Sequence, residues 1–195
     1  KKVINHHFEG RITLVVPCYN ESKRISKLLK ALKAFDSSWG KPFELIIVDD
    51  GSSDQTVEQI EKTFNGAFSS KVDFQLLQMP QNGGKGAALK SGVEKATGDH
   101  ILTIDADMAT SPMELLNWLK QLPGKTFQED EILIGSREHG KSKVAGNGLR
   151  RLAGLIFNFT IQFFTNLQIS DTQCGFKLYP AAIAKKLFGD LKSLG

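Results

Sequence analysis

The feature that most constrains the fold is a regular alternation of short β-branched runs with longer segments of helical periodicity. We expect strands at Ile12–Val16, Leu45–Val48, Phe74–Leu77, Ile101–Ile104 and Ile132–Ile134. Between the strands, apolar residues recur at helical spacing, as they do over 25–35. Such alternation is typical of α/β proteins, and it predicts a mostly parallel central sheet with helices on both faces. Pro17 is expected to end the first strand.

The composition is that of an ordinary globular protein of one domain. The chain has 195 residues, of which 24% are charged and 41% are hydrophobic, so we expect a single domain over 1–195. The formal net charge of +4 suits a protein that handles phosphates or lies near an anionic membrane, without requiring either. The two cysteines, Cys18 and Cys174, argue against a disulfide scaffold or a zinc site and indicate a reducing compartment.

Both ends of the chain suggest that it is part of something longer. It begins at Lys1 rather than at Met, and it stops at Gly195 soon after an expected helix. No signal peptide opens the sequence, and it contains no run of 18 apolar residues that would predict a transmembrane helix. We therefore expect a fragment of a longer, membrane-associated protein whose membrane segments lie elsewhere.

Polar residues follow several of the expected strands at the point where each strand ends. These residues lie at Pro17–Glu21, Asp49–Asp54 and Asp105–Asp107. In parallel α/β sheets, ligands bind outside the carboxyl ends of the strands. One shared site at this edge of the sheet is the simplest interpretation.

The pair Asp105 and Asp107 is the strongest single signal in the sequence. Side chains at positions i and i+2 of an extended segment point the same way, so the two carboxylates can face each other. At about 6 Å they repel by roughly 3 kcal/mol at an effective dielectric of 20, so a cation is needed there. Carboxylate oxygens suit Mg²⁺ or Mn²⁺, and Mg²⁺ commonly shares its shell with substrate phosphates. The alternative is a pair of solvated aspartates at a strand end.

The other strand ends carry residues that could bind a nucleotide. Tyr19 and Glu21 follow the first strand, although Glu21 could equally belong to a helix start. Asp49 or Asp50 could accept hydrogen bonds from a base N–H or a ribose hydroxyl. In N-G-G-K-G, Lys85 stands at an expected helix N-terminus, which is a natural anion site, but the spacing is not that of a P-loop.

The region after the fifth strand is basic, rich in glycine and followed by an apolar helix expected over 152–167. Arg137, Arg150 and Arg151 could each grip a phosphate or lie on the surface. The stretch Ser170–Tyr179 joins an acid to a turn and an expected strand, and Asp171 could be a site acid or a structural cap. The phenylalanines of the helix could belong to the core or rest on a membrane surface.

The chain resembles the family 2 inverting glycosyltransferases, which have the GT-A fold. The resemblance extends from about Thr13 to Tyr179 and rests on motifs in this order: P-C-Y-N-E, V-D-D-G-S-S-D-Q-T, G-G-K-G-A-A-L, T-I-D-A-D and S-D-T-Q-C-G-F-K-L-Y. Within the family the chain is most similar to the polyprenol-phosphate glycosyltransferases. The stretch D-T-Q-C-G-F-K-L is similar to the dolichyl-phosphate β-glucosyltransferases in particular.

The resemblance implies a role for individual residues. It implies that the nucleotide-sugar is bound by Pro17, Tyr19, Glu21, Asp49, Asp50, Lys85 and Asp105. It further implies that Asp105 and Asp107 hold the metal, that Asp107 and Asp171 are catalytic, and that Arg137 and Arg150 hold an acceptor phosphate. Some mannose-transferring relatives carry a glutamine two residues after the D-x-D. This chain has Ala109 there, which argues mildly against a GDP-mannose enzyme.

The function implied by this resemblance is metal-dependent, inverting transfer of a hexose, glucose in the first place, from a UDP-sugar to a polyprenyl or dolichyl phosphate. Mg²⁺ or Mn²⁺ is the implied cofactor, and no nucleic acid partner is expected. The implied location is the cytoplasmic side of a membrane, the plasma membrane in a bacterium or the endoplasmic reticulum in a eukaryote.

Several alternatives stay open from the sequence. The acceptor could be a polysaccharide or another non-lipid molecule, and the enzyme could use GDP-mannose as dolichyl-phosphate mannose synthase does. A metal-dependent phosphatase also carries D-x-D at a strand end, but there the motif follows the first strand. A non-catalytic nucleotide-sugar-binding module is a further alternative.

Overall fold

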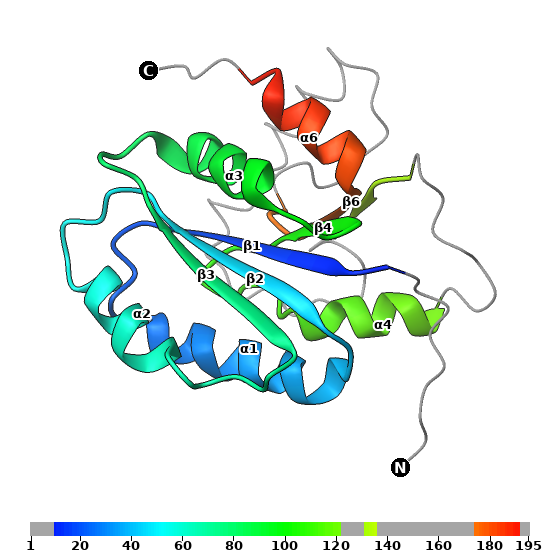
Figure 1. The fold of residues 1–195 in the computed structure, drawn as a ribbon, viewed down its shortest axis with the longest axis horizontal. Coiled ribbons are helices and arrows are strands. Elements are labelled where there is room, and N and C mark those ends of the chain that lie inside the picture. The colour runs from blue at the N-terminus through cyan, green and yellow to red at the C-terminus, as the bar shows by residue number, and fades with distance from the viewer. Residues whose placement is uncertain (1–9, 122–130, 136–173, 192–195) are drawn as a thin grey trace, which may run out of the picture.

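The structure is a computed structural model that describes residues 10–121, 131–135 and 174–191 (Figure 1). The strands are β1 (Ile12–Cys18), β2 (Phe43–Asp49), β3 (Val72–Gln78), β4 (His100–Thr103), β5 (Leu133–Ile134) and β6 (Lys177–Pro180). The helices are α1 (Ile25–Trp39), α2 (Thr56–Phe64), α3 (Gly84–Lys95), α4 (Met113–Gln121) and α6 (Ala181–Gly189). None of these helices is long and apolar enough to cross a membrane.

The strands form one sheet in the order β3-β2-β1-β4-β6-β5. The pairs β1–β2, β1–β4 and β2–β3 are parallel, which confirms the mostly parallel sheet predicted from the alternation. β6 is antiparallel to both of its neighbours, β4 and β5. Because β6 comes from the end of the chain, it places residues near 175 beside the end of β4, where the D-x-D stands.

The prediction that Pro17 ends the first strand is wrong, because β1 continues to Cys18. Alternate residues of β1 face its two neighbours: the Val15 carbonyl accepts from Ile104 N, and the Cys18 carbonyl accepts from Asp50 N. Pro17 lies two residues after Val15 and so faces the β4 side. There the pairing of β1 with β4 stops at Val15, so the missing N–H of proline leaves no partner unsatisfied.

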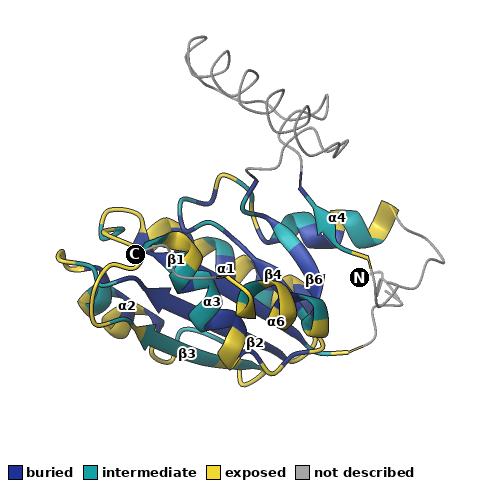
Figure 2. Ribbon diagram, turned by 90° about the horizontal axis from the view of Figure 1, so that it is seen from above, coloured by how far each residue is buried: buried dark blue, intermediate teal, exposed yellow. Residues whose placement is uncertain are grey.

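Helices cover both faces of the sheet, as the sequence predicts. Figure 1 shows α1, α2 and α4 on one side, and α3 and α6 on the other. The strands are mostly buried, while exposed residues lie on the outer helix faces and the loops (Figure 2). On the first side, Phe35, Phe43 and Phe64 are completely or almost completely buried. Each contributes about 1.5–3 kcal/mol through removal of its apolar surface from water.

On the other face, α3 lies unusually close to the sheet because of Gly92. A Cβ atom at this position would lie 2.5 Å from Cγ1 of Val15 and 3.0 Å from Cγ2 of Val48. Glycine therefore lets the helix backbone approach β1 and β2 more closely than any other residue would. This close packing fixes α3 against the strands whose ends carry the predicted site residues.

A buried carboxylate ties the opposite end of the sheet together. Glu44, near the start of β2, has no exposed surface. Its oxygens accept hydrogen bonds from Thr13 Oγ1 at 2.6 Å and from Thr97 N at 2.8 Å, and further bonds from Thr97 Oγ1 and Gln75 Nε2. Because donors surround this charge, Glu44 is a structural acid and differs from the acids at the carboxyl ends of the strands.

Candidate functional site

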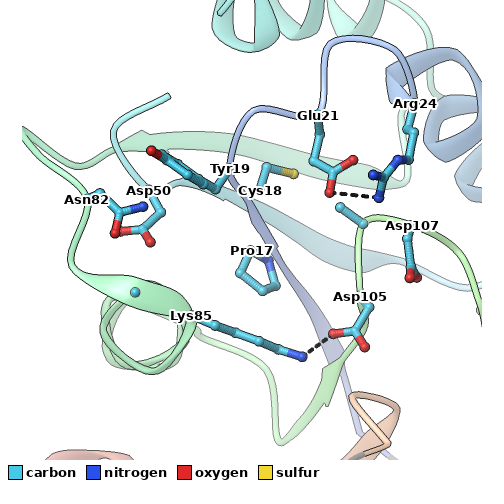
Figure 3. A pocket seen from close by; sticks show the side chains of 12 residues that line it. Pro17, Cys18, Tyr19, Glu21, Arg24, Asp50, Asn82, Lys85, Asp105 and Asp107 are labelled. Atoms are coloured by element: carbon cyan, nitrogen blue, oxygen red, sulfur yellow. Dashed lines mark hydrogen bonds and ion pairs between the residues drawn. The ribbon is translucent and has the colours of Figure 1, made fainter. Parts of the chain in front are cut away.

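A pocket of about 550 Å³ lies at the carboxyl ends of β1, β2 and β4, where the sequence places the shared site. Residues from four segments line it: Pro17, Cys18, Tyr19, Glu21, Arg24, Asp50, Asn82, Gly84, Lys85, Asp105, Ala106 and Asp107. Figure 3 shows Tyr19, Asp50 and Asn82 together in one part of the pocket and Asp105 and Lys85 in another. The pocket therefore has two parts. One offers an aromatic ring, an amide and a carboxylate from Tyr19, Asn82 and Asp50, and the other contains Lys85 with the two acids Asp105 and Asp107.

The loop after β1 is fastened to the loop after β2 through Asn20. This residue adopts a left-handed conformation with a φ of 52°, which asparagine tolerates better than most residues. Its Oδ1 accepts hydrogen bonds from Ser53 N at 2.9 Å and Asp54 N at 3.3 Å, and its backbone N–H donates to Ser52 Oγ at 2.9 Å. These three hydrogen bonds fix the loop that carries Tyr19. Tyr19 is 47% exposed, so its ring can contact a ligand.

The adjacent acids Asp49 and Asp50 have different surroundings. Asp50 lines the pocket, and its Oδ1 accepts a 2.8 Å hydrogen bond from Gly83 N at the start of α3. Asp49 is equally buried but does not line the pocket; its Oδ2 accepts from Ser52 N at 3.0 Å, and its buried Oδ1 has no hydrogen-bond partner among the described residues. The geometry thus presents Asp50 to a ligand and gives Asp49 a role in holding the turn.

The segment from Asp105 to Ala109 forms a tight turn that fixes Asp107. Met108 N donates to the Asp105 carbonyl at 3.1 Å, and Met108 has a φ of 53° with its side chain buried. Ala109 N donates to Asp107 Oδ1 at 2.8 Å, and Lys27 of α1 donates to the Asp107 carbonyl at 2.7 Å. The Asp107 carboxylate is therefore held from its own turn and its backbone from a neighbouring helix.

Lys85 and Asp105 form an ion pair across the pocket (Figure 3). Lys85 is the second residue of α3, so its ammonium extends from the positive end of a helix dipole toward an acid. The Lys85 side chain is 53% exposed and the Asp105 side chain 33%, so water and ligands reach both groups. This pair partly offsets the negative charge that Asp105 and Asp107 bring together.

Glu21 lines the pocket with a side chain that is largely buried. Burial raises the pKa of this carboxyl; the nearby Arg24 opposes the shift, and Asp107 and Asp54 add to it. Glu21 Oε1 pairs with Arg24 at 3.2 Å, while Oε2 is buried and has no hydrogen-bond partner among the described residues. An unpaired buried oxygen beside the pocket is suited to a donor from a bound ligand.

Gly175, just before β6, touches the Asp105 carboxylate. A Cβ atom here would overlap that carboxylate, because it would lie closer than 3.0 Å to the carboxylate atoms and real Cβ contacts are essentially never that short. The Gly175 carbonyl accepts from Thr103 Oγ1 at 2.8 Å, so its backbone is tied to β4. Sequence reasoning missed this residue, although a glycine in the motif C-G-F-K was a signal that could have been read.

The acids of the pocket determine which kind of metal ion it suits. No cluster of three or more His, Cys, Asp or Glu residues that could hold an ion occurs in the part of the chain that the structure describes. Two carboxylates in one pocket, however, are the usual protein share of a Mg²⁺ site in which substrate phosphates and water complete the shell. Asp105 and Asp107 therefore fit an ion that binds together with a phosphate ligand, and not a closed all-protein cage.

The predicted nucleotide and metal residues thus meet in one pocket, except for Asp49, which is buried next to Asp50 and does not line it. Arg137, Arg150 and Asp171, together with the alternative Arg151 and the helix expected over 152–167, lie outside the described residues. Two polar residues that line the pocket, Arg24 and Asn82, were not predicted. Arg24 could not be predicted as a pocket residue, because an arginine just before a helix is most often a solvated surface residue.

Comparison with known proteins agrees with this geometry. The sequence model described as Glycosyl transferase family 2 matches residues 13–188. The chain is 38% identical to dolichyl-phosphate beta-glucosyltransferase ALG5C of Trichomonas vaginalis, over 90% of this chain and 53% of the relative. It is 34% identical to the human dolichyl-phosphate beta-glucosyltransferase, over 93% and 58%, respectively. A dodecaprenyl-phosphate galacturonate synthase of Rhizobium johnstonii is 30% identical, over 92% and 51%.

Among solved structures, glucosyl-3-phosphoglycerate synthase from Mycobacterium tuberculosis, crystallised with Mn²⁺, UDP-glucose and phosphoglyceric acid, has a TM-score of 0.60. At 19% identity over 89% of this chain and 57% of that one, it supports the GT-A fold alone. The chain spans about half the length of the curated relatives it matches. On the extent of the family match and these identities, the chain belongs to glycosyl transferase family 2.

Proposed function

We propose that this chain is the catalytic domain of an inverting, metal-dependent glycosyltransferase that moves glucose from UDP-glucose to a dolichyl or other polyprenyl phosphate. The observation that carries the proposal is the pocket itself, which brings Asp50, Lys85, Asp105 and Asp107 to one edge of the sheet. Relatives named dolichyl-phosphate beta-glucosyltransferase, at 34–38% identity over most of this chain, support the acceptor and the sugar.

The part of the pocket around Tyr19, Asp50 and Asn82 binds the nucleoside of the donor in this proposal. The exposed Tyr19 ring offers a face for a base, and Asp50 offers a carboxylate oxygen that can accept from a base N–H or a ribose hydroxyl. Glu21 Oε2 is a further buried acceptor beside the pocket. Asp49 acts indirectly, because it holds the Ser52 backbone that shapes the loop.

The diphosphate of the donor lies against Asp105, Asp107 and Lys85. Asp105 and Asp107 would hold a Mg²⁺ or Mn²⁺ ion there, which when bound would supply a Lewis acid for the charge on the departing nucleotide. Lys85 contributes a positive charge on the same diphosphate from the N-terminus of α3, where backbone N–H groups also favour anions. The turn at Asp107 keeps the carboxylate in place while the charge on the diphosphate changes.

The acceptor needs little activation. Its phosphate oxygen is already anionic near neutral pH, so it can attack the anomeric carbon from the face opposite the diphosphate without a strong general base. The new bond joins this oxygen to the anomeric carbon, the bond to the UDP oxygen breaks, and UDP leaves with the electron pair. On the sequence resemblance, Arg137 and Arg150 hold the acceptor phosphate and Asp171 orients it.

A lipid phosphate acceptor places the reaction at a membrane surface, on the cytoplasmic side where nucleotide-sugars are made. In a eukaryote this is the endoplasmic reticulum, and in a bacterium the plasma membrane. The formal net charge of +4 fits a protein that works beside an anionic membrane surface.

A radiolabelled transfer assay tests the proposal. The protein is offered UDP-glucose, GDP-mannose and UDP-galacturonate in turn, each with a short polyprenyl phosphate and Mn²⁺. We expect label in the lipid fraction from UDP-glucose. Product from GDP-mannose alone would reverse the donor assignment, and transfer only to a polysaccharide would overturn the acceptor.

A second candidate donor is UDP-galacturonate, because one relative at 30% identity over 92% of the chain is named as a galacturonate synthase acting on dodecaprenyl phosphate. That candidate keeps the polyprenyl phosphate acceptor and changes the sugar. The galacturonate arm of the assay decides between the two.

A further inference from the structure

We propose that Lys85 holds the place of the metal while the donor is absent, and that the diphosphate of the donor releases Asp105 by drawing Lys85 away. The inference rests on the proposed function, because it concerns the order in which the metal and nucleotide reach that site. It adds that the two ligands are coupled through one lysine side chain.

The first support is the ion pair that Lys85 forms with Asp105. Its ammonium pairs with Asp105, an acid of the D-x-D, although the side chain is 53% exposed and could extend into water. Figure 3 shows the extended chain reaching from α3 to the Asp105 carboxylate. With this contact made, one oxygen of a carboxylate that suits a divalent ion is already engaged by a positive charge.

The second support is the position of Lys85 on its helix. The first turn of α3 carries no acidic residue, so a cation at this end is opposed by the helix dipole and gains from a nearby anion. Asp105 supplies that anion in the ligand-free protein. A diphosphate brings more charge, and it also meets the backbone N–H groups of the helix N-terminus, so it competes well for the lysine.

The third support is the weakness of the pair. Partly exposed ion pairs stabilise by an amount that corresponds to about a two- to fivefold change in an equilibrium constant. A contact of this strength opens readily when a ligand offers a better partner. The Gly175 backbone lies against the same carboxylate and limits its movement on that side, so Asp105 remains in the pocket when the lysine leaves.

When UDP is absent, a metal ion that binds Asp105 must first displace Lys85. When UDP is bound, its diphosphate has already drawn Lys85 away from Asp105. By linkage, UDP should raise the affinity for Mn²⁺ by its direct contact with the ion and by a further factor of about two to five through Lys85. Removal of the lysine should abolish the second factor only.

The test measures Mn²⁺ affinity by the electron paramagnetic resonance of free Mn²⁺, with and without saturating UDP, in the wild type, Lys85→Met and Lys95→Met. Lys95 is exposed at the far end of the same helix, so its variant removes an equal charge away from the pocket. Circular dichroism and urea unfolding confirm that each variant folds.

Without UDP, we expect Lys85→Met to bind Mn²⁺ about two- to fivefold more tightly than the wild type does, and Lys95→Met to match the wild type. With saturating UDP, the gain of Lys85→Met should vanish, and its UDP affinity should be lower. Equal gains with and without UDP would mean simple repulsion between two cations, and no gain without UDP would mean that the pair does not block the ion. Either result overturns the inference.

These outcomes are distinct from a failure of the proposed function. If UDP and Mn²⁺ do not strengthen each other's binding in the wild type, the pocket is not a metal–nucleotide site, and both proposals fail together. If they do so equally in the wild type and in Lys85→Met, only the inference about Lys85 fails.

Discussion

The contact between Gly175 and Asp105 allows a sharp test of the site through a single added methyl group. In Gly175→Ala, the new Cβ would overlap the Asp105 carboxylate. The backbone at this position is the less movable partner, because the Gly175 carbonyl accepts from Thr103 Oγ1 and Cys174 and Phe176 on either side are buried. The Asp105 side chain is 33% exposed and can rotate, so it is the group that should yield.

The expected size of the effect follows from that difference. Rotation of one exposed carboxylate should lower the unfolding free energy by no more than about 1 kcal/mol, the usual scale of a change that relaxes at a side chain end. The same rotation moves a proposed metal ligand, and changes of that kind typically weaken metal binding 10- to 100-fold. We therefore expect a large loss of Mn²⁺ affinity and of transfer with little loss of stability.

The assay combines three measurements on Gly175→Ala: Mn²⁺ affinity in saturating UDP, the rate of glucose transfer, and unfolding in urea. Gly86→Ala is the matched control, because no atom lies within 4 Å of a Cβ at Gly86 and it stands beside Lys85 in α3. The control should keep the Mn²⁺ affinity and be slightly more stable, since alanine favours a helix. Wild-type Mn²⁺ affinity in Gly175→Ala, or a loss of several kcal/mol in stability, would refute the reasoning.

Three further predictions concern acids in different surroundings. Asp107→Ala should abolish glucose transfer while Asp171→Asn leaves a measurable remnant, because Asp107 is proposed to hold the ion and Asp171 only to orient the acceptor; initial rates with a polyprenyl phosphate check this. Glu44→Ala should lower the unfolding free energy in urea by about 3 kcal/mol, because its buried donors lose their acceptor. Burial raises the pKa of Glu21, so the folded protein holds this proton more tightly than the unfolded chain does. The wild type should therefore lose stability relative to Glu21→Gln as the pH rises from the ordinary value of 4.5, which urea unfolding at a series of pH values can measure.

Each of these has its own contrary outcome. Equal and total loss of transfer in Asp107→Ala and Asp171→Asn would overturn the division of roles between them. Glu44→Gln keeps the shape and one acceptor, so it should lose less stability than Glu44→Ala; the reverse order would show that the charge itself is harmful there. A stability difference between the wild type and Glu21→Gln that does not change with pH would mean that the Glu21 carboxyl is not perturbed.

The main features of the fold could be predicted because they depend on local patterns. The β-branched runs and the helical spacing of apolar residues marked the elements near their observed bounds, and strand–helix alternation predicted parallel pairing. Pro17 was misjudged because a strand's tolerance of proline depends on which neighbour the residue faces. That depends on where β4 turns away, which is a property of the assembled sheet.

The pocket could be predicted in outline for a similar reason. Parallel strands bring their carboxyl ends to one edge, so Tyr19, Asp50 and Asp105 were expected to meet although they lie far apart in the sequence. A strand was expected at the end of the Ser170–Tyr179 stretch, where β6 lies, but its antiparallel pairing with β4 was not, and with that pairing came the contact of Gly175 with Asp105. Contacts of this kind join segments about 70 residues apart and have no periodic signal. The pair between Lys85 and Asp105 joins residues only 20 positions apart, but it too has no periodic signal and was missed.

The central claim is that Asp105 and Asp107 hold a cation against the diphosphate of a sugar donor. Its most direct test is a crystal structure with UDP-glucose and Mn²⁺, with anomalous differences recorded at the manganese edge. The claim predicts a manganese peak within coordinating distance of both carboxylates and of the diphosphate, with the Lys85 ammonium no longer on Asp105. A nucleotide bound elsewhere, or a manganese peak away from these two aspartates, would contradict it.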